Sequence, residues 1–112
     1  MSRHYHHCEY ESQRVCVLLG YDPALRQFFL QIISTADNTM LYASQADPNC
    51  EPESLEYCRK VLRDRGITVP ESLFHEIEKE SQGFAIHPVV EHFENGRQRV
   101  IVARLPSRDR EK

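Results

Sequence analysis

The segment 27–34 constrains the fold more than any other stretch of this chain. It reads Gln-Phe-Phe-Leu-Gln-Ile-Ile-Ser, and successive side chains of an extended strand point to opposite faces. The apolar side chains therefore divide into two sets, namely Phe28, Leu30 and Ile32 on one face and Phe29 and Ile33 on the other. A strand that is apolar on both faces is typical of a central position in a sheet. The pattern predicts that residues 27–34 form a central strand.

Two more strands are expected close to this one in the sequence. Residues 14–20 are rich in aliphatic and β-branched side chains, and residues 40–44 form a short third run. Turn-forming residues separate the three runs, with Gly, Asp and Pro within 20–24 and Asp and Asn within 36–39. The first half of the chain is therefore expected to consist of three strands.

Helical periodicity replaces the strand pattern after the turn residues 47–52. A first helix is expected to begin near Pro52, because proline is tolerated in a first turn, and to end before Gly66. Its apolar stripe has helical spacing and comprises Leu55, Cys58, Val61 and Leu62.

A second helical pattern follows almost at once and is expected to end at Gly83. Its first turn is placed at Pro70, with Thr68 or Val69 as the cap. The side chains expected to face inward are Leu73, Phe74 and Ile77. The side chains expected to face water are Glu71, Glu76, Glu78, Lys79 and Glu80.

Asn95 and Gly96 mark a β-hairpin near the end of the chain. This dipeptide favours a type I′ turn, which needs positive φ at both central residues. Taken as a two-residue loop, it pairs Glu94 with Arg97, His92 with Arg99, Val90 with Ile101 and Val89 with Val102. One opposite-charge pair and two apolar pairs support that register.

The expected elements follow one another in the order βββ-αα-ββ. Strand runs that are separate from helices predict an α+β fold, with a mostly antiparallel sheet of about five strands and two helices on one face. With 112 residues, the chain has room for one such domain, placed at 13–105. Residues 1–12 are expected to form a polar N-terminal arm, and residues 106–112 a charged C-terminal tail.

Composition and cysteine usage point to a cytoplasmic protein. No segment approaches the roughly 20 apolar residues of a spanning helix, and the N-terminus lacks the apolar region of a secretory signal. Four cysteines are irregularly spaced in a chain that is large enough to fold without crosslinks, namely Cys8, Cys16, Cys50 and Cys58. We therefore expect thiols and a reducing compartment.

The N-terminal segment holds the densest group of potential metal ligands, which are His4, His6, His7 and Cys8. Imidazole and thiolate suit zinc and other transition metals. His4 and His6 would share one side of an extended segment, with the other two alternating across it. No spaced pair of the CxxC kind accompanies them, so a zinc or other transition-metal site is an alternative rather than the main interpretation.

No catalytic motif stands out in this sequence. It has no glycine-rich phosphate loop, nucleophile elbow or HExxH motif, and only four glycines. A Cys/His pair that uses His75, His87 or His92 stays open, without a local signal that selects one of them. The sequence therefore favours a non-catalytic role.

Charge is unevenly distributed along the chain. Residues 37–94 hold twelve acidic against five basic side chains, whereas residues 97–112 hold six basic against two acidic ones. These charges suggest a protein-binding domain that serves as an accessory subunit, adaptor or inhibitor, through an acidic helical surface. The residues proposed for this surface are Glu71, Glu76, Glu78, Glu80, Arg97 and Arg99.

Two other interpretations stay open. The apolar strand surface at 27–34 exceeds what two short helices readily cover, which suggests a homodimer. The C-terminal arginines suggest a nucleic-acid partner, which the overall charge of −3 and a pI near 6.0 disfavour.

Overall fold

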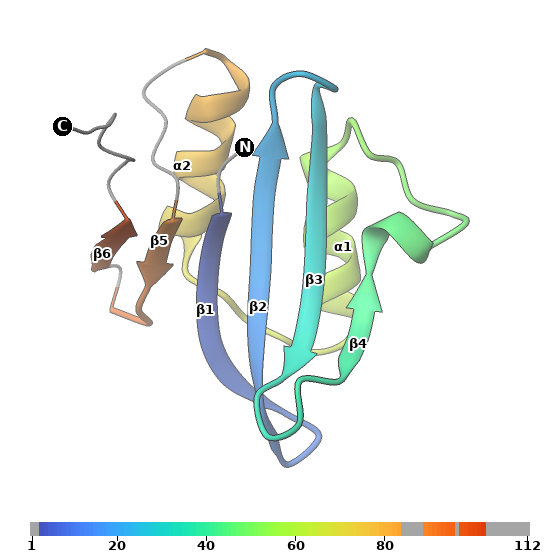
Figure 1. Ribbon diagram of the computed structural model, residues 1–112, viewed down its shortest axis with the longest axis vertical. Coiled ribbons are helices and arrows are strands. Elements are labelled where there is room, and N and C mark those ends of the chain that lie inside the picture. The colour runs from blue at the N-terminus through green and yellow to red at the C-terminus, as the bar shows by residue number, and fades with distance from the viewer. Residues whose placement is uncertain (1–2, 84–88, 96, 103–112) are drawn as a thin grey trace, which may run out of the picture.

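Six strands and two α-helices follow one another as strands, helices and strands, which confirms the predicted α+β fold (Figure 1). The computed structural model describes residues 3–83, 89–95 and 97–102. The strands are β1 (Arg3–Tyr10), β2 (Gln13–Asp22), β3 (Gln27–Ser34), β4 (Met40–Ala43), β5 (Val89–His92) and β6 (Gln98–Val102). The helices are α1 (Leu55–Asp64) and α2 (Glu71–Ser81), and a short 3-10 helix, η1 (Ser44–Ala46), follows β4.

All six strands belong to one sheet, in the order β4-β3-β2-β1-β5-β6. Every neighbouring pair is antiparallel except β1 and β5, which run parallel. As its two-sided apolar pattern predicts, β3 is an inner strand and pairs with β2 along its whole length. The parallel step is possible because both helices lie between β4 and β5 in the sequence and carry the chain across the sheet.

The N-terminal segment is the main departure from the sequence prediction. Residues 1–12 were expected to form an arm, but residues 3–10 form β1, which lies between β2 and β5. Two features explain the difference. The turn at Glu11 and Ser12 adopts positive φ, so β1 folds back onto β2, and the polar side chains of one face of β1 find buried partners.

The ends of α1 follow from local side-chain and backbone chemistry. Ser54 is the N-cap, and its hydroxyl accepts a hydrogen bond from the Tyr57 amide at 3.1 Å, so the helix begins slightly later than predicted. At the other end, Gly66 has φ +73°, and the amides of Gly66 and Ile67 bond back to the carbonyls of Arg63 and Leu62. This is the Schellman arrangement expected of a glycine at that position.

The second helix begins at Glu71, and Pro70, expected in its first turn, is instead the N-cap, so neither Thr68 nor Val69 caps it. Gly83, with φ +90°, follows its C-terminus as predicted. Within the described residues, no helix has the length and apolar character that crossing a bilayer requires.

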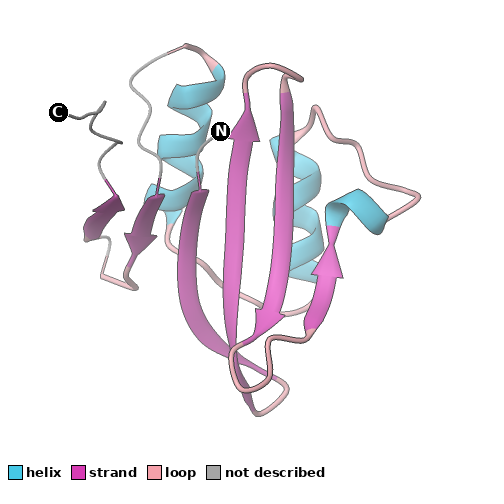
Figure 2. Ribbon diagram, viewed as in Figure 1, coloured by secondary structure: helices cyan, strands magenta, loops and turns pink. Residues whose placement is uncertain are grey.

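Both helices pack on the same face of the sheet, as Figure 2 shows, and the core lies between these layers. The sheet contributes Val15, Val17, Leu19, Leu30 and Ile32, and the helices contribute Cys58, Val61, Leu62, Leu73, Phe74 and Ile77. The inward-facing residues predicted for α2 are therefore confirmed, with Glu80 as an unexpected buried neighbour at 3 % exposure. We call this side of the sheet the covered face and the opposite side the open face.

The hairpin exists, but its register differs from the prediction. Val90 pairs with Val100, Glu91 with Arg99 and His92 with Gln98, one position away from the expected partners. Only Val89 with Val102 matches, because the register shifts between Val89 and Val90. The Phe93 amide donates to the Arg97 carbonyl at 2.9 Å, so three residues rather than two form the loop. The predicted tail at 106–112 lies outside the described residues.

Candidate functional site

The open face carries a continuous apolar strip across the middle of the sheet. The cross-strand pairs Met40–Ile33, Ile33–Cys16 and Leu18–Tyr5 place these side chains in neighbouring rows, and the polar Gln31 lies opposite Leu18 at the side of the strip. Both helices lie behind the sheet in the view of Figure 1, and no described segment covers this side. The strip is therefore an apolar surface without a covering layer in the described part of the chain.

One edge of the open face is shaped by the segment 44–52. Because β4 ends at Ala43, the first half of β3 has no strand partner on that side. Two of its amides find other acceptors: Leu30 donates to the Ser44 hydroxyl at 3.0 Å, and Phe28 donates to the Pro52 carbonyl at 2.6 Å. The segment therefore runs beside β3 and forms a wall at the edge of the sheet.

Asp47 fastens this wall to the rest of the domain. Its Oδ2 accepts hydrogen bonds from the hydroxyls of Tyr42 and Tyr57, at 2.6 and 2.7 Å, and its Oδ1 accepts from the Asn49 amide. The Tyr42 and Tyr57 hydroxyls lower the pKa of the Asp47 carboxyl. The same bonds raise the pKa of Tyr57 to about 12, so the anchor is one carboxylate held by two neutral phenols.

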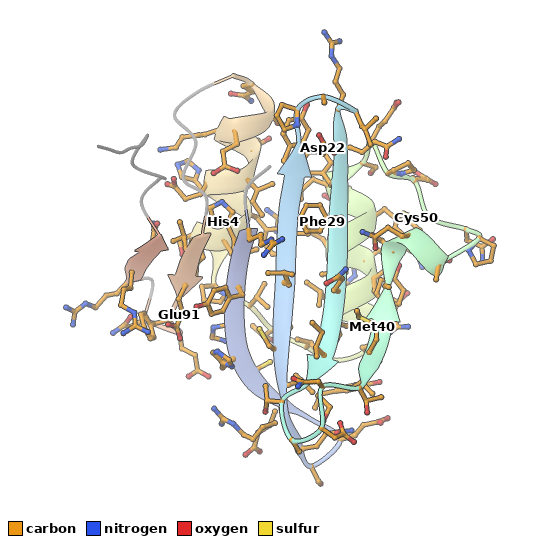
Figure 3. The ribbon with its side chains drawn as sticks, in the orientation of Figure 1. His4, Asp22, Phe29, Met40, Cys50 and Glu91 are labelled. Carbon is orange, nitrogen blue, oxygen red and sulfur yellow. The ribbon has the colours of Figure 1, made fainter. Side chains whose placement is uncertain are left out.

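A pocket of about 680 Å³ lies between this wall and the open face. Its apolar lining comes from Leu18, Leu25, Phe28, Phe29 and Pro52. Its polar lining includes Arg3, Asp22, Gln31, Gln45 and Asp47. In Figure 3, Phe29 lies on the open face of the sheet and Cys50 on the wall segment. The volume and the mixture of an apolar floor with a few polar groups are typical of a ligand or peptide site.

A second group of polar residues is buried on the covered face, where α2 crosses β1 and β5. Glu80 Oε2 lies 2.8 Å from His4 Nε2, His4 Nδ1 lies 2.9 Å from His92 Nε2, and His92 Nδ1 lies 2.9 Å from Ser72 Oγ. We call these four residues the histidine relay. Its two ends are eight residues apart on α2, about 12 Å, so the chain of bonds runs along two turns of the helix.

The relay is almost completely shielded from water. His4 is 0 %, His92 1 % and Glu80 3 % exposed, and Ser72 is half-buried. Burial lowers the pKa of His92 to about 4, assisted by the neighbouring His4 and His6, so His92 is neutral at physiological pH. A neutral imidazole has one donor and one acceptor nitrogen, so each bond of the relay fixes the direction of the next.

His6 lies beside the relay without joining it. Its Nδ1 lies 2.7 Å from the His92 carbonyl oxygen, and because a carbonyl only accepts, this nitrogen carries a proton. Its Nε2 is buried and has no hydrogen-bond partner within the described residues. The ring therefore ties β1 to β5 through one bond.

No family model, curated protein or solved structure matches this chain. The pocket on the open face and the relay on the covered face are the two features of the described residues that suggest a function.

The predicted metal ligands do not come together. His4 and His6 point into the covered face and are buried, whereas His7 is exposed on the open face and forms an edge contact with Tyr5. Cys8 lies on the covered side with His6, so His7 and Cys8 alternate across the strand as expected. Among the described residues, no group of three or more His, Cys, Asp or Glu side chains has a metal-binding arrangement.

The predicted acidic surface of α2 is partly neutralised by basic side chains. The two carboxylate oxygens of Glu71 accept from Arg59 at 2.9 and 3.1 Å, and Glu76 lies 3.4 Å from Lys79. Glu78 is exposed, as expected. Glu80 is not part of the surface, because it is buried against His4.

The predicted basic residues lie at the far end of the sheet from the pocket. Arg97 is exposed in the β5–β6 connection, and Arg99 is paired with Glu91 across the hairpin at 2.6 Å. The remaining C-terminal arginines, which carried the nucleic-acid alternative, lie outside the described residues.

The four cysteines are free thiols. Burial raises the pKa of Cys16 to about 11 and that of Cys58 to about 12. Cys50 lines the pocket, where burial and then Asp47 and Glu51 raise its pKa too. A raised pKa lowers the fraction of reactive thiolate, so the cysteines are poor nucleophiles.

Sequence reasoning missed Ser72, and it named His92 only as one of three possible partners of a cysteine. His92 had one signal, since it lies two residues after Val90 and so shares its buried side of β5. Ser72 had none, because a serine in a first helical turn is common and its partner is 20 residues away. The pocket was missed for a similar reason: its wall depends on the carbonyl and hydroxyl contacts of the segment 44–52 with β3.

Proposed function

We propose that this chain is a protein-binding domain that holds a segment of a partner protein in the pocket and along the apolar strip of the open face. The observation that carries this proposal is the pocket of about 680 Å³ at the edge of a sheet face that no described segment covers. Interaction sites commonly combine an apolar centre, which is dry when bound, with polar groups at the rim.

The lining favours a partner segment with an apolar anchor beside a basic side chain. Phe29 and Leu18, on the open face, supply an apolar floor for the anchor. Asp47 stays ionised because two tyrosine hydroxyls stabilise its charge, and Asp22 adds a second carboxylate to the lining. The lining carries two carboxylates and one guanidinium, so its net negative charge would repel a phosphate backbone. A protein segment therefore suits the pocket better than a nucleic acid.

Photo-crosslinking in the native cells tests this role. A photoreactive amino acid at Gln31, in the pocket, should capture a discrete partner, whereas the same group at Glu78, exposed on α2, should not. Binding of that partner, once purified, should be lost in Phe29→Lys and retained in Phe93→Lys, a matched change at the 38 % exposed Phe93 of the hairpin.

Two outcomes contradict the proposal. Equal binding by both lysine variants would exclude the pocket as the binding site. If Gln31 crosslinked only to a second copy of this chain, the pocket would be the interface of a homodimer and not a site for a different protein.

We also propose that the domain works in a reducing compartment such as the cytoplasm. All four cysteines are free, and Cys58 is buried among core side chains rather than placed to form a disulfide. Alkylation during cell lysis should therefore modify accessible thiols without prior reduction, and the intact mass should show no disulfide-linked species.

A further inference from the structure

Ser72 is the one member of the histidine relay that reaches the surface. Its side chain is half-buried and lines a shallow pocket of about 360 Å³ together with Arg59, Glu71, His75 and Glu78. The Oγ atom lies 2.9 Å from His92 Nδ1, which is hydrogen-bond distance for proton transfer. Ser72 therefore combines a hydroxyl that is hydrogen-bonded to a buried imidazole with a place in the lining of a surface pocket, two features that a nucleophile needs.

The bonds of the relay set the direction in which its protons point. The Glu80 carboxylate only accepts, so His4 Nε2 donates to it. When His4 is neutral, its Nδ1 accepts from His92 Nε2, and His92 Nδ1 is left as an acceptor for the Ser72 hydroxyl. When His4 carries a second proton, the direction reverses and His92 donates to Ser72 instead. Only the first state prepares Ser72 Oγ to lose its proton.

The start of α2 offers donors for a developing negative charge. Pro70 is the N-cap and provides no side-chain hydrogen bond to the amides of the first turn, where Ser72 lies. Backbone amides at a helix N-terminus stabilise anionic groups. The placement of Ser72 in this turn therefore adds a second favourable feature, independent of the relay.

The charges around Ser72 select the class of substrate. Arg59 is held by both oxygens of Glu71 and stacks over the Phe74 ring at 4.0 Å, so its charge is already paired. Glu78 adds a further carboxylate to the lining. This environment disfavours phosphate esters and other anions, and it admits a small neutral carboxylic ester.

We propose that Ser72 is the nucleophile of an acyl-transfer site, with His92 as its general base and His4 and Glu80 as positioning residues. Ser72 Oγ forms a bond to the acyl carbon as its proton moves to His92 Nδ1, and the ester C–O bond breaks. The leaving alkoxide takes that proton, and a water molecule then hydrolyses the acyl-serine by the same route. This site is on the covered face and does not depend on the binding role of the open face.

A fluorophosphonate probe tests the proposal on the intact purified chain. The serine oxygen displaces fluoride from phosphorus, so mass spectrometry should find the adduct on the peptide that contains Ser72. Ser72→Ala should remove the adduct and reduce hydrolysis of p-nitrophenyl acetate by roughly a hundredfold, the range of general-base assistance. Ser81→Ala, at an exposed-side serine of the same helix that bonds the Glu78 carbonyl, is the matched control.

Two further measurements separate catalysis from a structural role. The rate of probe labelling should rise as the pH is raised through the His92 pKa of about 4, because only the neutral His92 ring can accept the Ser72 proton, and Glu80→Gln should change that pH profile. Ser72→Cys should place a thiol against His92, and iodoacetamide should alkylate it about tenfold faster than Cys50, whose thiol pKa is raised. An unlabelled Ser72 in the folded protein, or a labelling rate independent of pH, would overturn the proposal.

Discussion

The sheet buries polar side chains of β1 on its covered face and leaves apolar side chains of β3 partly exposed on its open face. On the covered face, His4 is fully buried and its polar imidazole ring is shielded from water. On the open face, Phe29 and Ile33 are only half-buried, although they are apolar. A buried polar group is tolerated when its hydrogen bonds are satisfied, whereas an apolar strip gains only when something covers it.

The two regions are stabilised in different ways. The relay is complete within the chain, because carboxylate, imidazoles and hydroxyl satisfy one another at 2.8–2.9 Å. The open face instead carries apolar side chains that no described segment covers, and under the proposed binding role a segment of a partner protein covers them. Substitutions on the covered face should therefore change folding stability, and substitutions on the open face should mainly change binding.

The largest expected effect comes from breaking the relay at Glu80. Glu80→Ala removes the acceptor of His4 Nε2 and leaves that ring buried without its carboxylate. We expect the free energy of unfolding to fall by about 3 kcal/mol, the cost of removing one partner from a buried pair. Urea unfolding measures it, with Glu78→Ala on the exposed side of α2 as the control, expected within about 0.5 kcal/mol. Equal losses in both variants would show that the relay contributes no more than a surface carboxylate.

The second prediction compares the loss of stability on truncating two adjacent apolar residues of β3, one on each face of the sheet. Leu30 is 0 % exposed in the core, and Leu30→Ala should lower the free energy of unfolding by about 3 kcal/mol through lost contacts and a residual cavity. Phe29→Ala, one residue away on the open face, should cost only about 1 kcal/mol, because water already reaches the ring. Urea unfolding measures both changes. A loss at Phe29 as large as that at Leu30 would mean that the open face is covered in solution.

The opposite faces of Leu30 and Phe29 could be predicted from the sequence, because successive side chains of a strand alternate between the two faces of a sheet. The same reasoning failed for β1, whose residues His4, Tyr5 and His6 lack an apolar face. These histidines are buried because Glu80 and His92 lie opposite, 76 and 88 positions away from His4. No local pattern reports a partner at that distance.

The helices and strands could be predicted from the sequence, but the pocket could not, because only the former produce a repeating pattern of side chains. Repeating side-chain patterns reveal helices, strands and their buried sides, as at Leu73 and Ile77 of α2. The pocket instead depends on Ser44 and Pro52 meeting the amides of β3, and such contacts leave no periodic signal. The offset register of the hairpin has a similar origin, since one irregularity beside Val89 moves all later pairs by one position.

A third expected effect is loss of stability in mild acid. The pKa of His92 is lowered from 6.5 to about 4 in the folded state, so the unfolded chain binds more protons between these values. Stability from this group is complete above pH 6.5 and is lost as the pH falls towards 4. Urea midpoints at pH 7 and pH 5 should therefore differ in the wild type and differ less in His92→Gln.

His75 supplies the control for this pH dependence, because it is an exposed histidine on α2. His75→Gln should leave the difference between the two pH values unchanged. A pH dependence that follows His75 rather than His92 would contradict the assignment of the buried ring as neutral.

The smallest expected effect concerns the ion pair on the open side of the hairpin. Arg99 and Glu91 lie 2.6 Å apart, but the Arg99 side chain is 64 % exposed, so water and salt screen their attraction. Arg99→Ala should change the free energy of unfolding by no more than about 0.5 kcal/mol, measured by urea unfolding at low and high salt. The His4–Glu80 pair has a similar distance of 2.8 Å and a predicted effect several times larger. If Arg99→Ala and Glu80→Ala lowered the free energy of unfolding equally, shielding from water would not strengthen the His4–Glu80 interaction. The two faces of the sheet would then differ only in apolar packing.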